Sequence, residues 1–96
     1  MENLAISKGA LLLKALGNQK RLEILYYLSE KEMSVGELEA KVGLSQSALS
    51  QHLAVLRRRE IVKTRRKAQT IYYSLRSETA SKLLALLDKQ YNHPYK

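Results

Sequence analysis

The chain has 96 residues, of which 45% are hydrophobic, so it can form one domain with one core but not two. It contains no cysteine, which excludes disulfides, thiolate metal sites and thiol redox chemistry. The formal net charge is +8, and residues 49–96 carry all of the excess, which favours a polyanionic partner over a merely solubilising surface.

Capping residues predict two helices in the first third of the chain. Asn3 can cap a first helix that ends at Gly17-Asn18, and Asn18 can cap a second helix that runs to about Ser29. Residues 31–33 are then expected to form a short connection.

A helix-turn-helix unit is predicted over residues 34–59. The sequence from Ser34 to Glu37 matches a capping box, which begins a short third helix. Gly43 supplies a permissive backbone for a tight turn, and Ser45 caps a fourth helix that runs to about Arg59. Two short helices joined by such a turn are typical of this motif.

A β-hairpin is predicted over residues 60–75, after the long fourth helix. Residues 61–66 are rich in β-forming residues, and residues 69–75 are dense in β-branched and aromatic side chains. The connection around Lys67-Ala68 lacks an Asn-Gly turn, so the sequence leaves the register of the hairpin open.

A last helix, capped by Ser77, is expected to extend to about Tyr91, and His93 in the following tail is expected to be solvated.

No signal peptide and no apolar stretch of membrane-spanning length is evident, so we expect a soluble, cytoplasmic protein with no membrane association.

The fourth helix carries the most specific functional signal. Leu49, Leu53 and Leu56 share one face, which is expected to be buried. The opposite face near the helix start shows side chains that can bond to base edges in a major groove, namely Gln46, Ser47, Ser50 and Gln51. Unpaired N–H groups beside Ser45 can also bind a phosphate. The alternative is an ordinary amphipathic helix with a hydrated outer face.

Basic side chains continue from the end of this helix into the hairpin. Arg57 can oppose the helix dipole or reach a phosphate. The stronger candidates for phosphate contact are Lys63, Arg65, Arg66 and Lys67, because a hairpin tip can lie along a groove and can insert an arginine into a narrow one. His52 lies beside the buried leucines and is expected to support the fourth helix or to contact a phosphate.

No catalytic constellation appears, because a nucleophile elbow, a phosphate loop and paired carboxylates are all missing, and the chain is not expected to be an enzyme. Its two histidines stand 41 residues apart without cysteines, so no metal site or cofactor is predicted.

In the pairs Tyr26-Tyr27 and Tyr72-Tyr73 one member of each is expected to pack inward, with a small ligand pocket as an alternative.

The run SVGELEAKVGLSQSALSQHLAVLRR, followed by IVKTRRKAQTIYYSL, resembles the ArsR/SmtB family of bacterial winged-helix transcriptional repressors. The resemblance covers roughly Leu16 to Leu87 and is greatest to the branch typified by HlyU, BigR and NolR. It implies a mainly α winged helix-turn-helix domain with the order helix–helix–helix–helix–strand–strand–helix.

The resemblance also implies a homodimer formed by the first and last helices, residues 1–17 and 77–92, with residues 60–75 as the wing. Each subunit would place its fourth helix in one major groove of an imperfect inverted repeat. The base-reading positions of the family fall on Gln46, Ser47, Ser50 and Gln51, and those of its wing fall on Arg65, Arg66, Lys67 and Gln69.

The sensing chemistry of the family is missing from this chain. Metal sensors often carry Cys-x-Cys where residues 34–36 read Ser-Val-Gly, and their last-helix ligand pattern Asp-x-His is replaced by residues 88–90, Asp-Lys-Gln. Thiol sensors pair cysteines on the second and last helices, where this chain offers tyrosine or asparagine. The inducers of the family are therefore not carried over, and the small-molecule effector is unknown.

These observations predict a homodimeric regulator of double-stranded DNA, in the first instance a repressor that competes with polymerase. Displacement of another DNA-bound protein is a second mode of action. Two alternatives of another class stay open: a winged helix that serves as a protein-interaction module, and an effector-responsive sensor with a noncanonical pocket near the tyrosines.

Overall fold

The structure of the protein, a computed structural model, describes residues 3–94. Its elements are α1 (Leu4–Leu16), α2 (Gln19–Glu30), β1 (Met33–Ser34), α3 (Val35–Val42), α4 (Gln46–Arg58), β2 (Val62–Lys67), β3 (Thr70–Leu75) and α5 (Glu78–Tyr91). The predicted order of five helices with a hairpin before the last one is confirmed, and the short strand β1 is an addition that the sequence analysis had assigned to a connection.

Side-chain caps explain why the helices begin where they do. Each capping side chain accepts a hydrogen bond from a backbone N–H two or three residues later, and the five caps are Asn3, Asn18, Ser34, Ser45 and Ser77. Replacing one such cap by alanine typically costs about 1 kcal/mol. Between α3 and α4 the chain turns at Gly43, whose φ of 65° is the left-handed conformation that glycine adopts without strain.

The three strands form one antiparallel sheet in the order β1-β3-β2. The pair Lys67↔Thr70 closes the hairpin, so its loop consists of Ala68 and Gln69 alone, with Ala68 at a φ of 55°. On its other side β3 pairs with β1 only at Tyr72 and Tyr73. The outer part of the hairpin therefore has no third strand beside it.

One hydrophobic core holds the domain together. Its fully buried side chains come from α2, α3, α4, β2, the residue before β2, and α5, and the largest are Ile24, Leu25, Leu38, Leu49, Leu56, Ile61 and Val62. Among residues 3–94 no polar or charged side chain is buried with this core. The predicted stripe on α4 is confirmed, because Leu49, Leu53 and Leu56 are all buried.

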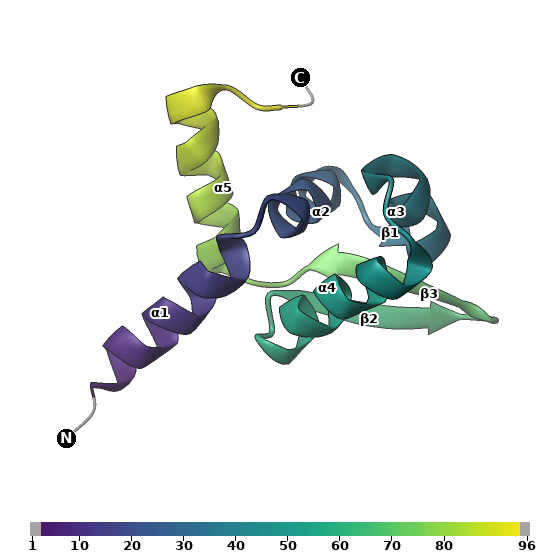
Figure 1. The fold of residues 1–96 in the computed structure, drawn as a ribbon, viewed down its shortest axis with the longest axis horizontal. Coiled ribbons are helices and arrows are strands. Elements are labelled where there is room, and N and C mark those ends of the chain that lie inside the picture. The colour runs from purple at the N-terminus through teal and green to yellow at the C-terminus, as the bar shows by residue number, and fades with distance from the viewer. Residues whose placement is uncertain (1–2, 95–96) are drawn as a thin grey trace.

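The two ends of the molecule differ in character. Figure 1 shows α1 and α5 together at one end, while the hairpin of β2 and β3 projects from the other. The large exposed hydrophobic side chains lie on α1 and α5, namely Leu4, Ile6, Leu11, Leu13, Leu86 and Tyr91. None of the helices in the described part of the chain is both long and apolar enough to cross a membrane.

Candidate nucleic-acid interface

The exposed side chains of α4 divide into two adjacent groups around the helix. Ser47 and Gln51 lie one turn apart and point straight away from the buried leucines. Gln46, Ser50 and Arg57 recur at helical spacing on the flank that faces the hairpin. Four of the predicted base-contacting residues are thus exposed together on the outer half of one helix.

A hollow with both polar and apolar walls separates this flank of α4 from the hairpin, and Glu39 of α3 also lines it. It measures about 660 Å³, and we call it the wing groove. Gln46 and Ser50 line it on the α4 side, whereas Gln69 and Thr70 line it on the hairpin side. A hollow of about 370 Å³ continues it, sharing Ser50 and reaching Arg57. Both sides therefore offer hydrogen-bonding side chains to one elongated space, and Gln69 is among them.

The start of the helix-turn-helix is fixed by a reciprocal capping box. Ser34 Oγ accepts from Glu37 N–H at 3.2 Å, and Glu37 Oε1 accepts from Ser34 N–H at 3.1 Å. That backbone hydrogen bond, followed by the Ser34 hydroxyl and nearby lysines, lowers the pKa of Glu37 below its usual value. Ser45 Oγ likewise accepts from Ala48 N–H at 3.2 Å, so this hydroxyl caps α4 as predicted.

His52 lies on the opposite flank of α4 and connects it to the first two helices. Its Nδ1 lies 3.3 Å from Nη1 of Arg21, whose Nε also donates to the carbonyl of Ala15 at 2.6 Å. Partial burial, followed by the Arg21 charge, lowers the pKa of His52. A neutral imidazole accepting from Arg21 fits this geometry, and it holds α4 against the body of the protein.

The basic side chains of the hairpin differ in their surroundings. Arg66 and Lys67 are exposed, and neither forms an ion pair within residues 3–94. Arg65 instead donates two hydrogen bonds from Nε and one from Nη2 to the carboxylate of Glu32, at 2.6 to 3.0 Å. The hydrogen bonds to Arg65 lower the pKa of Glu32. These three of the predicted phosphate ligands are therefore not equivalent.

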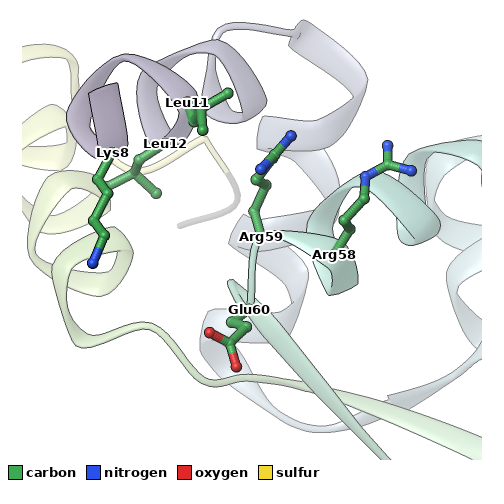
Figure 2. Close-up of a pocket in the computed structure, with 6 residues that line it drawn as sticks. All are labelled: Lys8, Leu11, Leu12, Arg58, Arg59 and Glu60. Atoms are coloured by element: carbon green, nitrogen blue, oxygen red, sulfur yellow. The ribbon is translucent and has the colours of Figure 1, made fainter. Parts of the chain in front are cut away.

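The far end of α4 also lies across a cleft from α1. Figure 2 shows Lys8, Leu11 and Leu12 on one side of a cleft of about 300 Å³, with Arg59 and Glu60 on the other. Cations at this position oppose the negative end of the α4 dipole. Two cations of this run, Arg57 and Arg58, also line the hollow beside Ser50.

The tyrosines do not gather around one site. Tyr26 is buried and meets the ring of His93 edge-on, with 5.1 Å between the centroids. Tyr72 packs under Arg65, and Tyr73 lines the wing groove. As predicted, one member of the first pair is buried and the other is half-buried, whereas both members of the second pair are half-buried.

The expectation for His93 is wrong. Its side chain is only 10% exposed, and Nε2 lies 3.1 Å from Oε1 of Glu30. The ring docks on Tyr26 because an aromatic edge and a carboxylate are available side by side at the end of α2. Within residues 3–94 no group of three or more His, Asp or Glu side chains is arranged to hold a metal ion.

Three residues of the candidate interface were not predicted from the sequence. Thr70 lines the wing groove beside Gln69, Glu32 binds Arg65, and Arg21 binds His52. Thr70 could have been found, since it adjoins the predicted turn. The other two contacts join residues more than 30 positions apart and left no signal in the local sequence.

Comparison with known proteins points to one family. Residues 18–64 match the family described as bacterial regulatory protein, arsR family. The transcriptional activator HlyU of Vibrio cholerae is 51% identical over 85 residues, which are 88% of this chain and 79% of HlyU. The nodulation protein NolR of Rhizobium meliloti is 57% identical over 79 residues, which are 82% of this chain and 65% of NolR.

Solved structures share the fold. The transcriptional repressor BigR from Xylella fastidiosa superposes with a TM-score of 0.84 at 42% identity, covering 90% of this chain and 88% of BigR. A homodimeric winged helix-turn-helix DNA-binding domain from Mycobacterium bovis, Mb0332, superposes with a TM-score of 0.80 at 30% identity, covering 88% of this chain and 78% of that domain.

Proposed function

Because the chain belongs to the ArsR family of bacterial regulatory proteins, in the branch of HlyU, NolR and BigR, we propose that it represses transcription as a homodimer on an imperfect inverted repeat. It is a winged helix-turn-helix DNA-binding transcriptional regulator. In this proposal α4 of each subunit enters a major groove, and the hairpin contacts the flanking backbone.

One observation carries the proposal, namely the wing groove with hydrogen-bonding side chains on both sides. A winged helix grips duplex DNA by placing a helix in the major groove and the hairpin beside it, so that a sugar-phosphate strand passes between the two. Gln46 and Ser50 are then placed to read base edges, while Arg66 and Lys67 lie beyond the groove where phosphates follow.

A homodimer is supported by the apolar surface of α1 and α5. An apolar groove of about 250 Å³ is lined mainly by these two helices, together with Gly17 after α1 and Leu22 of α2; its lining residues are Leu13, Leu16, Gly17, Leu22, Leu83, Leu84, Leu86 and Leu87. Surfaces of this kind are typical of obligate interfaces. Mb0332 is described as homodimeric, which agrees with this assignment.

Repression is the simplest consequence of such binding. A dimer that covers a repeat within a promoter excludes polymerase from the same DNA, whereas activation requires a further contact or the displacement of another protein. HlyU is named an activator and BigR a repressor, so both outcomes occur among relatives. The proposal assigns the chain no catalytic step, and it places the protein in the cytoplasm with the chromosome.

The test is selection of bound fragments from a random DNA pool, using the purified full-length chain at near-physiological salt. We expect an imperfect inverted repeat, whose two halves are separated by about one helical turn. A pool without a motif, combined with binding that modest salt abolishes, would contradict the proposal and favour the protein-interaction module. A variant with Ser81→Ala, which changes an exposed serine on the side of α5 turned away from the apolar groove, should recover the same motif and serves as a control.

A further inference from the structure

Arg65 lies where the hairpin leaves the body of the protein. It pairs with Tyr72 across the hairpin, and Tyr72 in turn pairs with Ser34 of β1. Beyond this row β2 and β3 have only each other, so residues 66–70 form a free wing tip. The orientation of that tip depends on the last row that is anchored to β1.

The side chain of Arg65 reinforces this row. Its guanidinium carbon lies 4.7 Å from the centroid of the Tyr72 ring, and its donors reach the Glu32 carboxylate just before β1. Because β3 is the middle strand, this side chain passes over β3 from the outer strand to the start of β1. We call Glu32, Arg65 and Tyr72 the wing strap.

The wing strap has a geometry that a single point charge would not provide. Nε and Nη2 of Arg65 both donate to the carboxylate of Glu32, a fork that is specific to arginine. The side chains are partly exposed, 53% for Arg65 and 32% for Glu32. An ion pair with this exposure contributes little to overall stability, so its main effect is expected on geometry.

We propose that Arg65 is a positioning residue, and that the wing strap sets the angle at which the wing tip presents Arg66, Lys67 and Gln69 to DNA. The inference rests on the proposed function, and it assigns Arg65 no phosphate of its own. Its guanidinium is already engaged by a carboxylate and an aromatic face, whereas Arg66 and Lys67 have no carboxylate partner among the described residues.

The decisive variant is Glu32→Gln, which removes a negative charge near the proposed DNA surface. If Arg65 held a phosphate, releasing it from Glu32 would leave binding unchanged or tighter. If the strap positions the wing, Glu32→Gln should weaken operator binding by roughly threefold to tenfold. Arg65→Gln and Arg65→Lys should weaken it to a similar extent, because lysine keeps the charge but not the fork.

The salt dependence separates the two roles of Arg65. A lost phosphate contact reduces the slope of log K against log salt by about 0.9 per subunit, whereas a misplaced wing changes affinity at nearly constant slope. We expect Arg65→Gln, which removes the charge, to keep nearly the wild-type slope while it binds more weakly; a slope reduced by about 0.9 would instead assign Arg65 a phosphate. Unchanged or tighter binding by Glu32→Gln, or full affinity in Arg65→Lys, would overturn the proposal. Glu78→Gln removes a paired carboxylate from α5 and is the charge-matched control.

A measurement without DNA keeps this inference separate from the proposed function. Amide hydrogen exchange of residues 66–70 should accelerate in Glu32→Gln and in Arg65→Lys, with no change in the rest of the sheet. Unchanged exchange in the wing tip would overturn the strap even if the chain binds an operator. Faster exchange in a chain that binds no specific DNA would uphold the strap and reject the proposed function.

Discussion

The half of the molecule that contains α3, α4 and the hairpin differs from the half formed by α1 and α5 in the polarity of its outer surface. In the first half apolar side chains face the core, and the outer surface is polar or cationic, as on α4. In the second half leucines also face outward: Leu13 is 60% exposed and Leu86 is 61% exposed.

The comparison shows how the burial of apolar surface is divided. The half that contains the wing groove completes its hydrophobic burial within one chain, which frees its surface for a polar, charged ligand. The half with α1 and α5 leaves apolar area that only another surface can cover, at roughly 25 cal/mol for each Å² removed from water. In the proposed homodimer a second copy of the chain would cover both faces by symmetry.

The largest effect is expected from making the apolar half polar. Leu13→Asp places a carboxylate in the apolar groove, so the dimer should dissociate while the exposed position leaves the monomer folded. Binding to an inverted repeat should fall by about 100-fold or more, because two linked contacts become one. Sedimentation and DNA titration measure the two effects. Ser81→Asp, on the exposed side of α5, is the control, and a Leu13→Asp protein that remains dimeric would contradict the assignment.

The next effect concerns the cations of the wing tip. Replacing Arg66 and Lys67 by alanine should weaken binding to every duplex about tenfold or more, and should reduce the salt slope by up to about 2 per subunit. Titrations at several salt concentrations give the slope. Lys89→Ala removes a lysine from α5 and should leave it nearly unchanged. An unaltered slope in the double variant would assign the phosphate contacts to other residues.

A smaller effect, confined to specificity, is expected from the α4 side of the wing groove. Gln46→Ala combined with Ser50→Ala should reduce the preference for the operator over random DNA by about tenfold, while affinity for random DNA stays the same. Competition titrations with the two kinds of duplex measure this ratio, with Ser81→Ala, on the side of α5 turned away from the apolar groove, as the control. Equal loss on both duplexes would mean that these side chains do not read bases.

The same two halves show what the sequence could predict. Helix starts were predicted to within a residue because each depends on a local signal, namely an Asn or Ser cap followed by apolar residues at helical spacing. The fourth helix, its buried stripe and the hairpin followed from equally local patterns. The exposed leucines of α1 were assigned to dimerisation only through the family resemblance, because burial within one chain uses the same residues.

Contacts between distant residues were beyond local patterns. Strand β1 has two residues and depends on pairing with Tyr72 and Tyr73, nearly 40 positions later. Arg65 looked equivalent to Arg66 because nothing in the neighbouring sequence announces Glu32. His93 looked solvated because docking on Tyr26 depends on where α5 ends relative to α2. In each case the structure differs from the prediction because of a tertiary contact. Two of these contacts, the pairing of β1 with β3 and the hydrogen bonds between Arg65 and Glu32, determine the proposed orientation of the wing tip.

The smallest effect expected is on the stability of the helix-turn-helix itself. The folded-state pKa of Glu37 is lowered by the Ser34 N–H, so its charge stabilises the protein above the unfolded pKa of a glutamate, and that contribution is lost as pH falls through the lowered value. Glu37→Gln keeps an acceptor for the capping box but removes the charge. Its melting temperature should therefore lie slightly below wild type at pH 7 and approach wild type under acidic conditions. Glu78→Gln controls for the change in net charge. If the difference in melting temperature between wild type and Glu37→Gln grew as the pH fell, the charge of Glu37 would not stabilise α3. The Ser34 hydroxyl would then be the effective cap on this side of the wing groove.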